Sequence, residues 1–168
     1  SFHSGKVRDC ITYKDQIFLL HTDRLTAFDK TIGYVPFKGI ILAEINNFWH
    51  KLAGKLTQRC HTKLLNNRTI VMKKFTPIKI EIVVRRYLAG SLLRSYKEGL
   101  RLLYGYKLKD KLTAYTAFES PIITPTTKAE QGDHDSPITY NEIITSKLCK
   151  KSQLDEIYSI SKKMFQLG

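Results

Sequence analysis

Long apolar runs and a recognisable leader segment are lacking in this sequence. No apolar run approaches the roughly 20 residues that a membrane-spanning helix needs, and Ser1–Lys6 contains no apolar core of a signal peptide. We therefore expect a cytoplasmic protein with no membrane partner. The chain begins without Met, so we also expect residues in front of Ser1 to be missing.

Cysteine is scarce and irregularly spaced. Cys10, Cys60 and Cys149 are far apart, and no two of them have the spacing of metal ligands or of a redox pair. His61 follows Cys60, but an isolated Cys-His pair is rarely a metal site. We expect reduced, structural thiols.

Acidic residues are outnumbered by basic ones. The sequence has 28 Lys and Arg against 15 Asp and Glu, a net charge of +13. Two kinds of partner suit this charge: a nucleic acid, whose phosphates it would neutralise, or small anionic substrates drawn into a positive cleft. Basic residues occur singly or in pairs, and no ribonucleoprotein motif, zinc-finger spacing or basic zipper is present. Apolar residues make up 42%, which indicates a globular protein.

The first half of the chain contains one clear strand and one clear helix. Residues 16–22 are typical of a buried strand, and the mixed residues 23–29 predict a loop at its end. Between Gly39 and Leu56, apolar residues recur at helical spacing and form one stripe, which we expect to pack in the core. The stripe consists of Ile41, Ile45, Phe48, Trp49, Leu52 and Leu56.

The second half predicts strands and then helices. Residues 69–75 and 78–88 are β-rich, and Pro77 enforces a break between them. Ala89-Gly90-Ser91 opens a short helix that ends at Gly99. Residues 100–120 predict a loop with short strands, and the polar residues 121–135 predict a loop. Thr139 and Ser152 each precede an acidic residue by three positions, a pattern that starts helices.

Together these elements predict an α+β fold. The sequence contains no Gly-rich dinucleotide or Walker loop. It also contains no internal repeat and no low-complexity segment.

Polar clusters suited to anions begin in the first thirty residues. In Ser4–Asp9, Gly5 lets backbone amides approach a phosphate and Lys6 supplies a point charge, although a Gly-Lys pair is usually just a turn. Asp23-Arg24 and Phe28-Asp29 place two carboxylates and an Arg on the loop after the first buried strand. A local ion pair is the simpler interpretation of that second cluster.

A further cluster lies where the strand over 78–88 meets the following helix. Glu81 and Arg85 share one strand face, and burying an acid and a base there is costly unless they meet a partner or ligand. A solvent-facing edge is the alternative. Gly90 and Ser91 lie at the helix start, where free N–H groups suit an anion that Arg85 would also reach. The alternative for Ser91 is an ordinary helix N-cap.

The last cluster spans residues 124–135. Thr hydroxyls, Lys128 and Asp135 on a loop stiffened by Pro125 suit a nucleotide or a metal-bound phosphate. His134 and Asp135 would make a general base with its orienting carboxylate, but adjacent side chains usually point apart.

Taken in order, these motifs resemble those of the phosphoribosylaminoimidazole-succinocarboxamide synthases, or SAICAR synthetases. The resemblance extends from Ser4 to about Leu167. Asp-Arg-x-x-Ala-Phe-Asp and Thr-Pro-Thr-Thr-Lys-Ala are the most specific segments. The others are Ser-Gly-Lys-Val-Arg-Asp, Pro-x-Lys-Gly, Phe-Trp, Glu-x-Val-Val-Arg, Gly-Ser and the later His-Asp.

The resemblance implies an activity and a fold. Such enzymes use ATP and Mg²⁺ to activate the carboxylate of carboxyaminoimidazole ribonucleotide (CAIR), and the amine of L-aspartate then attacks to give SAICAR, ADP and phosphate in purine biosynthesis. Three anionic substrates would explain the basic charge without nucleic acid. The family fold is similar to protein kinases and ATP-grasp enzymes, which implies an ATP-binding β-rich lobe over residues 1–76 and a second α+β lobe over 77–168.

Individual roles also follow from the resemblance. Gly5, Lys6 and Arg8 would lie on the ATP phosphates, and the 73–77 connection would bind adenine at Lys74 and Phe75. The substrate-binding residues would be Asp23, Arg24, Glu81, Arg85 and Ser91, with Lys128 and Asp135 as catalytic residues.

Two departures from the family pattern stand out. Arg86 replaces a common Gly and would either crowd the loop or add a phosphate contact. The family continues beyond this last helix with segments that hold metal-binding acids and another Arg, so we expect a C-terminally truncated chain with no metal ligands of its own. An inactive nucleotide-binding fragment stays an alternative to the ligase. The absence of His-Arg-Asp and Asp-Phe-Gly argues against a kinase-like phosphotransferase.

Overall fold

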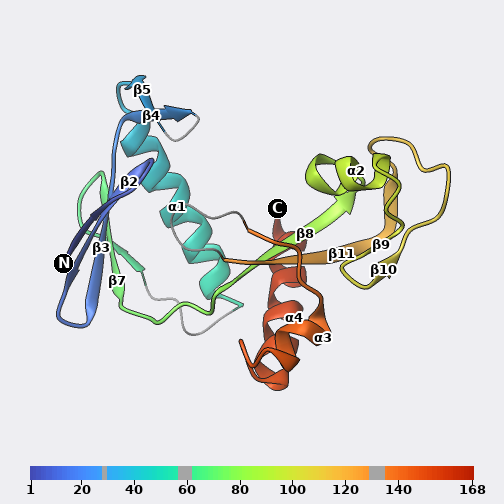
Figure 1. Ribbon diagram of the computed structural model, residues 1–168. Helices are drawn as coiled ribbons and strands as arrows, with labels where there is room; N and C mark the ends of the chain where they lie inside the picture. Colours follow the sequence, from blue (N-terminus) through green and yellow to red (C-terminus); the bar gives the residue numbers. More distant parts are fainter. Residues whose placement is uncertain (28–29, 57–61, 129–134) are drawn as a thin grey trace. The chain divides into compact units, whose positions relative to one another are not determined.

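The chain folds into two compact units, Ser1–Thr76 and Pro77–Gly168. A computed structural model describes residues 1–27, 30–56, 62–128 and 135–168 (Figure 1). Pro77 lies in a segment without regular structure between the last strand of unit 1 and the first strand of unit 2. A proline cannot donate to a strand ladder, which explains the break there.

Unit 1 is built on an antiparallel sheet whose strand order, over the described residues, is β1-β2-β3-β7-β6. The strands are β1 (Phe2–Ser4), β2 (Arg8–Tyr13), β3 (Gln16–His21), β6 (Thr62–Leu64) and β7 (Thr69–Lys73). The predictions of strands at 16–22 and 69–75 are therefore confirmed. Asn66 forms the turn before β7, because its side-chain oxygen accepts from the N–H groups of Arg68 and Thr69.

A hairpin follows the sheet's third strand, which corrects the loop predicted over residues 23–29. β4 (Arg24–Ala27) pairs antiparallel with β5 (Lys30–Tyr34). Leu25 and Ala27 alternate with Arg24 and Thr26, and this period of two is too short a run to distinguish from a mixed loop in sequence. Phe28 and Asp29 lie outside the described residues.

Helix α1 (Lys38–Gly54) packs on the sheet through its smallest residues, which corrects the core role expected for the apolar stripe. Its buried positions are Gly39, Ala43 and Asn47, whereas Trp49 is 44% exposed and Phe48 is 59% exposed. The helix lies so close to the sheet that a Cβ on Gly39 would be 2.5 Å from the His21 carbonyl oxygen. Small side chains are therefore required on the face of α1 that meets the sheet, and the large side chains lie on its exposed faces. Figure 1 shows α1 beside the sheet of unit 1.

Unit 2 is centred on a long antiparallel strand pair. β8 (Ile80–Tyr87) pairs with β11 (Ala117–Thr127), and the register shifts between Ala117 and Ile122. β11 corrects the loop predicted over 121–135. Pro121 lies within the irregular stretch, and Pro125 is accommodated although it cannot donate to a partner strand. β9 (Leu102–Leu103) and β10 (Tyr106–Lys107) form a short hairpin, as predicted for residues 100–120.

The helices of unit 2 start close to the positions that the sequence indicates. α2 (Gly90–Lys97) begins at the predicted Gly-Ser pair. α3 (Tyr140–Thr145) has the predicted capping box of Thr139 and Glu142. α4 (Lys151–Leu167) begins before the expected Ser152, because the Lys150 N–H donates to the Gln153 side chain.

Two apolar clusters form the core of unit 2, and together with unit 1 they confirm the α+β class. One contains Leu88, Leu92, Tyr96 and Leu108, and the other contains Ile138, Ile143, Cys149 and Leu154. Burial raises the pKa of the Cys149 thiol, so Cys149 behaves as a small apolar side chain. Cys60 and His61 lie outside the described residues. Within the described part, no helix is long and apolar enough to cross a membrane.

His21 is a buried histidine that unit 1 holds in its neutral form. Its Nδ1 lies 3.3 Å from the Arg68 carbonyl oxygen, and its Nε2 lies 3.2 Å from the Asn46 side-chain nitrogen. A carbonyl only accepts, so Nδ1 carries the proton and Nε2 accepts from Asn46. Burial, followed by the charge of Arg8, lowers the pKa of His21 below its ordinary value of 6.5.

This lowered pKa predicts that acid weakens the fold. Well above pH 6.5, His21 is neutral in both the folded and the unfolded chain. Below 6.5, the unfolded chain takes up the proton first, so the free energy of unfolding falls as the pH drops. Urea unfolding at about pH 7.5 and about pH 5.5 measures this loss. His21→Gln should flatten the pH dependence; an equally steep one would show that His21 does not cause it.

Candidate functional site

The loop from Gly5 to Val7 connects β1 and β2 through a tight turn. The Gly5 N–H donates to the Arg8 carbonyl oxygen over 2.9 Å. A Cβ on Gly5 would lie 2.8 Å from that same oxygen, closer than real Cβ atoms approach. Glycine is therefore required here for the turn itself. The structure places Gly5 and Lys6 on this loop and Arg8 at the start of β2, with Lys6 and Arg8 exposed.

Arg24 is hydrogen-bonded to this loop and forms an ion pair with Asp9. Its guanidinium donates to Asp9 over 2.6 and 3.3 Å, and to the Gly5 carbonyl oxygen over 2.7 Å. The two side chains are only 17% and 14% exposed. Hydrogen bonding from Arg24 is the main cause that lowers the pKa of Asp9, and Ser4 adds to it. Arg24 and Asp9 thus form a charged pair that is largely shielded from solvent.

Asp23 lies next to Arg24 in the chain and binds a different basic residue. Arg68 donates to both of its carboxylate oxygens, over 2.7 and 3.1 Å. The Gly39 N–H donates to Asp23 over 2.8 Å, which ties the start of α1 to β4. Arg68 lowers the pKa of Asp23 more than any other group. Sequence reasoning missed Arg68, because its partner is 45 residues away and no local pattern marks the pair.

The connection predicted to bind adenine begins immediately after β7. The Lys74 N–H donates to the Asp15 carbonyl oxygen over 2.7 Å, and Phe75 is 50% exposed.

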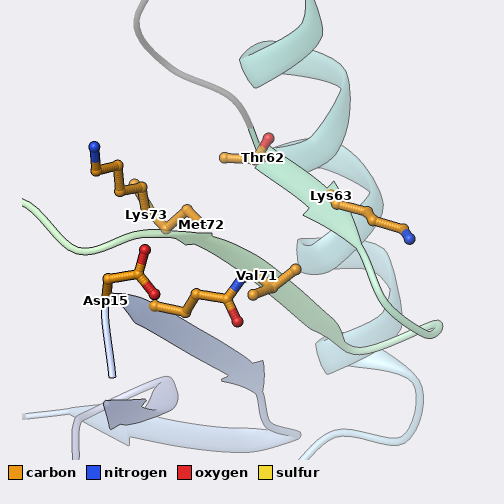
Figure 2. Close-up of a pocket in the computed structure, with 7 residues that line it drawn as sticks. Asp15, Thr62, Lys63, Val71, Met72 and Lys73 are labelled. Atoms are coloured by element: carbon orange, nitrogen blue, oxygen red, sulfur yellow. The ribbon is translucent and has the colours of Figure 1, made fainter. Parts of the chain in front are cut away.

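A pocket of about 330 Å³ lies beside this connection (Figure 2). Along β7, Val71 and Lys73 point to the side opposite the buried Ile70. The lining residues are Asp15, Gln16, Thr62, Lys63, Val71, Met72 and Lys73.

In unit 2, the Arg85 side chain is hydrogen-bonded to the start of α2. Its Nε donates to the Thr124 hydroxyl and its Nη2 donates to the Ser91 hydroxyl, each over 3.0 Å. Thr124 is 1% exposed, and its hydroxyl donates to the Val83 carbonyl oxygen. The hydroxyl that accepts from Arg85 is therefore itself held in place. The N-cap residue of α2 is Ala89, not Ser91, and its side chain makes no capping bond. The Ser91 hydroxyl is thus a neighbour of Arg85 at the helix start.

Gly90 shapes the approach to this helix start. It has a φ of +58°, which L side chains rarely adopt. A Cβ at this position would lie 3.5 Å from Arg85 Nη1. The guanidinium, the Ser91 hydroxyl and the N–H groups of the first helical turn therefore converge on one small region suited to an anion.

The other predicted residues of unit 2 lie at the far end of the β8–β11 pair. Lys128 Nζ is 3.0 Å from Glu81, and both side chains are about half exposed. Thr126 and Pro137 form an antiparallel bridge, and the Thr127 N–H donates to the Ser136 carbonyl oxygen. Continuing this register places Asp135 opposite Lys128 along the backbone. His134 lies outside the described residues.

Over residues 1–27, 30–56, 62–128 and 135–168, no group of three or more His, Cys, Asp or Glu side chains is arranged to hold a metal ion.

Comparison with solved structures identifies the fold as that of the SAICAR synthetases. A SAICAR synthase from Saccharomyces cerevisiae, complexed with SAICAR, matches with a TM-score of 0.81 at 24% identity, over 99% of this chain and 61% of that one. A Type-2 SAICAR synthetase in complex with ADP matches with a TM-score of 0.76 at 22% identity, over 99% of this chain and 66% of that one. At this identity the likeness concerns the fold.

The sequence comparison establishes the family. The SAICAR synthetase family model matches residues 1–168, and the chain belongs to this family. The chloroplastic phosphoribosylaminoimidazole-succinocarboxamide synthase of Arabidopsis thaliana is 35% identical over 98% of this chain and 40% of its own length. A putative synthase 2 of Agrobacterium fabrum is 32% identical over 100% of this chain and 55% of its own length. The chain thus spans about half the length of these relatives.

Proposed function

We propose that this chain serves the reaction that joins L-aspartate to CAIR at the expense of ATP. The CAIR carboxylate attacks the γ-phosphorus of ATP, which releases ADP and forms an acyl phosphate. The aspartate amine then attacks the acyl carbon, phosphate leaves, and the amine loses a proton as the amide of SAICAR forms. Membership of the SAICAR synthetase family supports this proposal.

The observation that carries the proposal is the arrangement of Arg85 and Ser91 at the start of α2. The phosphate of a ribonucleotide needs several donors at once, and a guanidinium with a nearby hydroxyl and helix N–H groups supplies them. Because Thr124 already holds the guanidinium, the Arg85 side chain would lose little conformational freedom when the ligand binds. Glu81 would then contact the ribonucleotide from the same strand.

The nucleotide is proposed to bind to unit 1. Gly5, Lys6 and Arg8 would face the ATP phosphates from the β1–β2 loop, and backbone groups at Lys74 and Phe75 would contact adenine. The ADP complex of a protein with the same fold supports nucleotide binding. Mg²⁺ would neutralise the phosphates, and its ligands are not proposed among the described residues of this chain.

Lys128 and Asp135 are the proposed catalytic residues. The Lys128 ammonium, now paired with Glu81, would shift to the developing charge of the transferring phosphate or the CAIR carboxylate. Asp135 would orient the aspartate amine and accept its proton. We also propose that the protein is cytoplasmic and has no nucleic-acid partner.

Product analysis tests this proposal. Incubating the chain with ATP, Mg²⁺, L-aspartate and CAIR should give SAICAR and ADP in equal amounts, measured by mass spectrometry. Lys128→Met should abolish product while ATP and CAIR still bind, because it removes a charge that acts in the transition state. Lys162→Met on α4 is the control and should behave like the unmodified chain. Lys162→Met losing activity together with Lys128→Met would contradict the assignment.

A second candidate is ligand binding without turnover. In that case calorimetry would detect ATP and CAIR binding although no SAICAR forms. Failure to bind either ligand would overturn both candidates.

A further inference from the structure

The backbone carbonyls of the Gly5–Val7 loop are held by side chains from one short extended segment. Arg24 Nη2 donates to the Gly5 carbonyl over 2.7 Å, and the Thr26 hydroxyl donates to the Lys6 carbonyl over 2.6 Å. The Thr22 hydroxyl donates to the Val7 carbonyl over 2.9 Å. Thr22, Arg24 and Thr26 are two residues apart, so they lie on one side of the extended chain. We call these three residues the carbonyl clamp.

The carbonyl clamp is itself fixed in place. Arg24 is bound by Asp9, and Asp9 also accepts from the Ser4 hydroxyl over 2.8 Å. Lys38 at the start of α1 donates to the Arg24 carbonyl over 2.6 Å. The Thr22 N–H adds a backbone bond of 3.0 Å to Val7. The loop is therefore bonded directly to Thr22 and β4. β4 is in turn bonded through Arg24 to β2 and to α1.

Clamped carbonyls determine which way the loop's N–H groups point. A trans peptide places its C=O and N–H on opposite sides. Holding the Gly5, Lys6 and Val7 carbonyls toward the clamp therefore turns the N–H groups of the same peptide units to the other side. Successive N–H groups on one side form a concavity that attracts anions, while the carbonyl oxygens, which repel anions, face away.

We propose that Thr22, Arg24 and Thr26 are positioning residues that hold the Gly5–Val7 loop ready for the phosphates of a nucleoside triphosphate. This inference rests on the proposed function of unit 1. It assigns Arg24 a different role from the direct substrate contact that the family resemblance implies. Both Nη atoms of Arg24 are already bonded to Asp9 or Gly5, so direct contact with a substrate would require breaking those bonds. The clamp instead lowers the entropy cost of ordering the loop on binding.

The sharpest test removes one hydroxyl. Thr26→Val has nearly the same shape but cannot donate to the Lys6 carbonyl, so ATP affinity measured by calorimetry should fall about threefold to tenfold. Thr26→Ser keeps the donor and should restore most of the affinity. Thr31→Val is the matched control, because Thr31 is exposed and pairs with Thr26 across the β4–β5 hairpin. It should leave ATP affinity unchanged, and CAIR affinity should be unchanged in all three variants.

Hydrogen exchange provides a readout that does not depend on a ligand. The Gly5 amide, which donates to the Arg8 carbonyl oxygen, should exchange faster in Thr26→Val than in Thr31→Val. Normal exchange together with normal ATP affinity in Thr26→Val would overturn the clamp and leave the proposed function intact. An unmodified chain that fails to bind ATP would overturn both. If Thr26→Val does not fold, Thr22→Val repeats the test with the Thr22 backbone bond retained, and unchanged ATP affinity in that variant overturns the clamp.

Discussion

Replacing Arg85 with Lys is expected to weaken CAIR binding by roughly tenfold to a hundredfold, the value of one or two hydrogen bonds to a charged group. Arg85 bridges Thr124 and Ser91 through two different nitrogens, Nε and Nη2. A lysine ammonium is a single point charge on a flexible stem and cannot span both hydroxyls while it faces an anion. Because Lys keeps the positive charge, the loss of CAIR affinity would reflect the lost hydrogen-bond geometry and not a change in net charge.

Calorimetry with CAIR measures this effect, with ATP as the internal reference because its proposed site is in unit 1. The matched control is Arg86→Lys at the next residue of β8. The Arg86 guanidinium donates to the Glu119 carbonyl oxygen beside the irregular stretch of β11, and adjacent strand residues point to opposite faces. CAIR affinity should be normal in this control. Weak binding in Arg86→Lys with normal binding in Arg85→Lys would place the phosphate on the opposite face of the strand.

The proximity of Arg85 and Ser91 could be predicted because only a strand end and a helix start separate them. Six residues across such a junction leave few possible paths, and the sequence marks the junction with Gly90. The capping box of Thr139 and Glu142 was predictable for the same reason, since both partners lie within one helical turn. Short-range patterns thus predict that these two side chains lie close together.

Contacts between distant residues could not be predicted in this way. The pairing of Asp23 with Arg68 depends on β7 returning beside β3, which no local pattern shows. β11 was missed because its prolines and threonines resemble a loop, and β8 and the segment near Ser136 accommodate them only in the folded unit. The apolar stripe of α1 was assigned to the core because periodicity reveals an apolar face but not which face meets the sheet.

The motif residues around Arg24 make contacts that hold the fold of unit 1 together. Asp23 binds the Gly39 N–H, and Lys38 binds the Arg24 carbonyl. The segments Asp-Arg and Pro-x-Lys-Gly, which are separate in sequence, therefore interlock in space. These contacts help to fix the start of α1 beside β4.

Gly39→Ala is expected to destabilise unit 1 by about 1–3 kcal/mol or more, as overpacking does in a filled site. The added Cβ would lie 2.5 Å from the His21 carbonyl oxygen and 2.7 Å from Arg68 Nη1. The first is backbone of β3, so α1 would have to move away from the sheet. The second holds Asp23, so the ion pair would also shift. In an open helix position the same change would stabilise by about 1 kcal/mol, and the expected sign is therefore opposite.

Urea unfolding of the variant and of the unmodified chain measures this difference. The matched control is Gly33→Ala in β5, where an added Cβ would meet nothing within 4 Å, and its stability should change by less than about 0.5 kcal/mol. The variant should also bind ATP more weakly, because the Gly39 N–H and Lys38 anchor the segment that carries the clamp. A Gly39→Ala chain as stable as the Gly33→Ala chain would show that α1 lies farther from β3 than 2.5 Å implies, and that its small residues do not serve close packing.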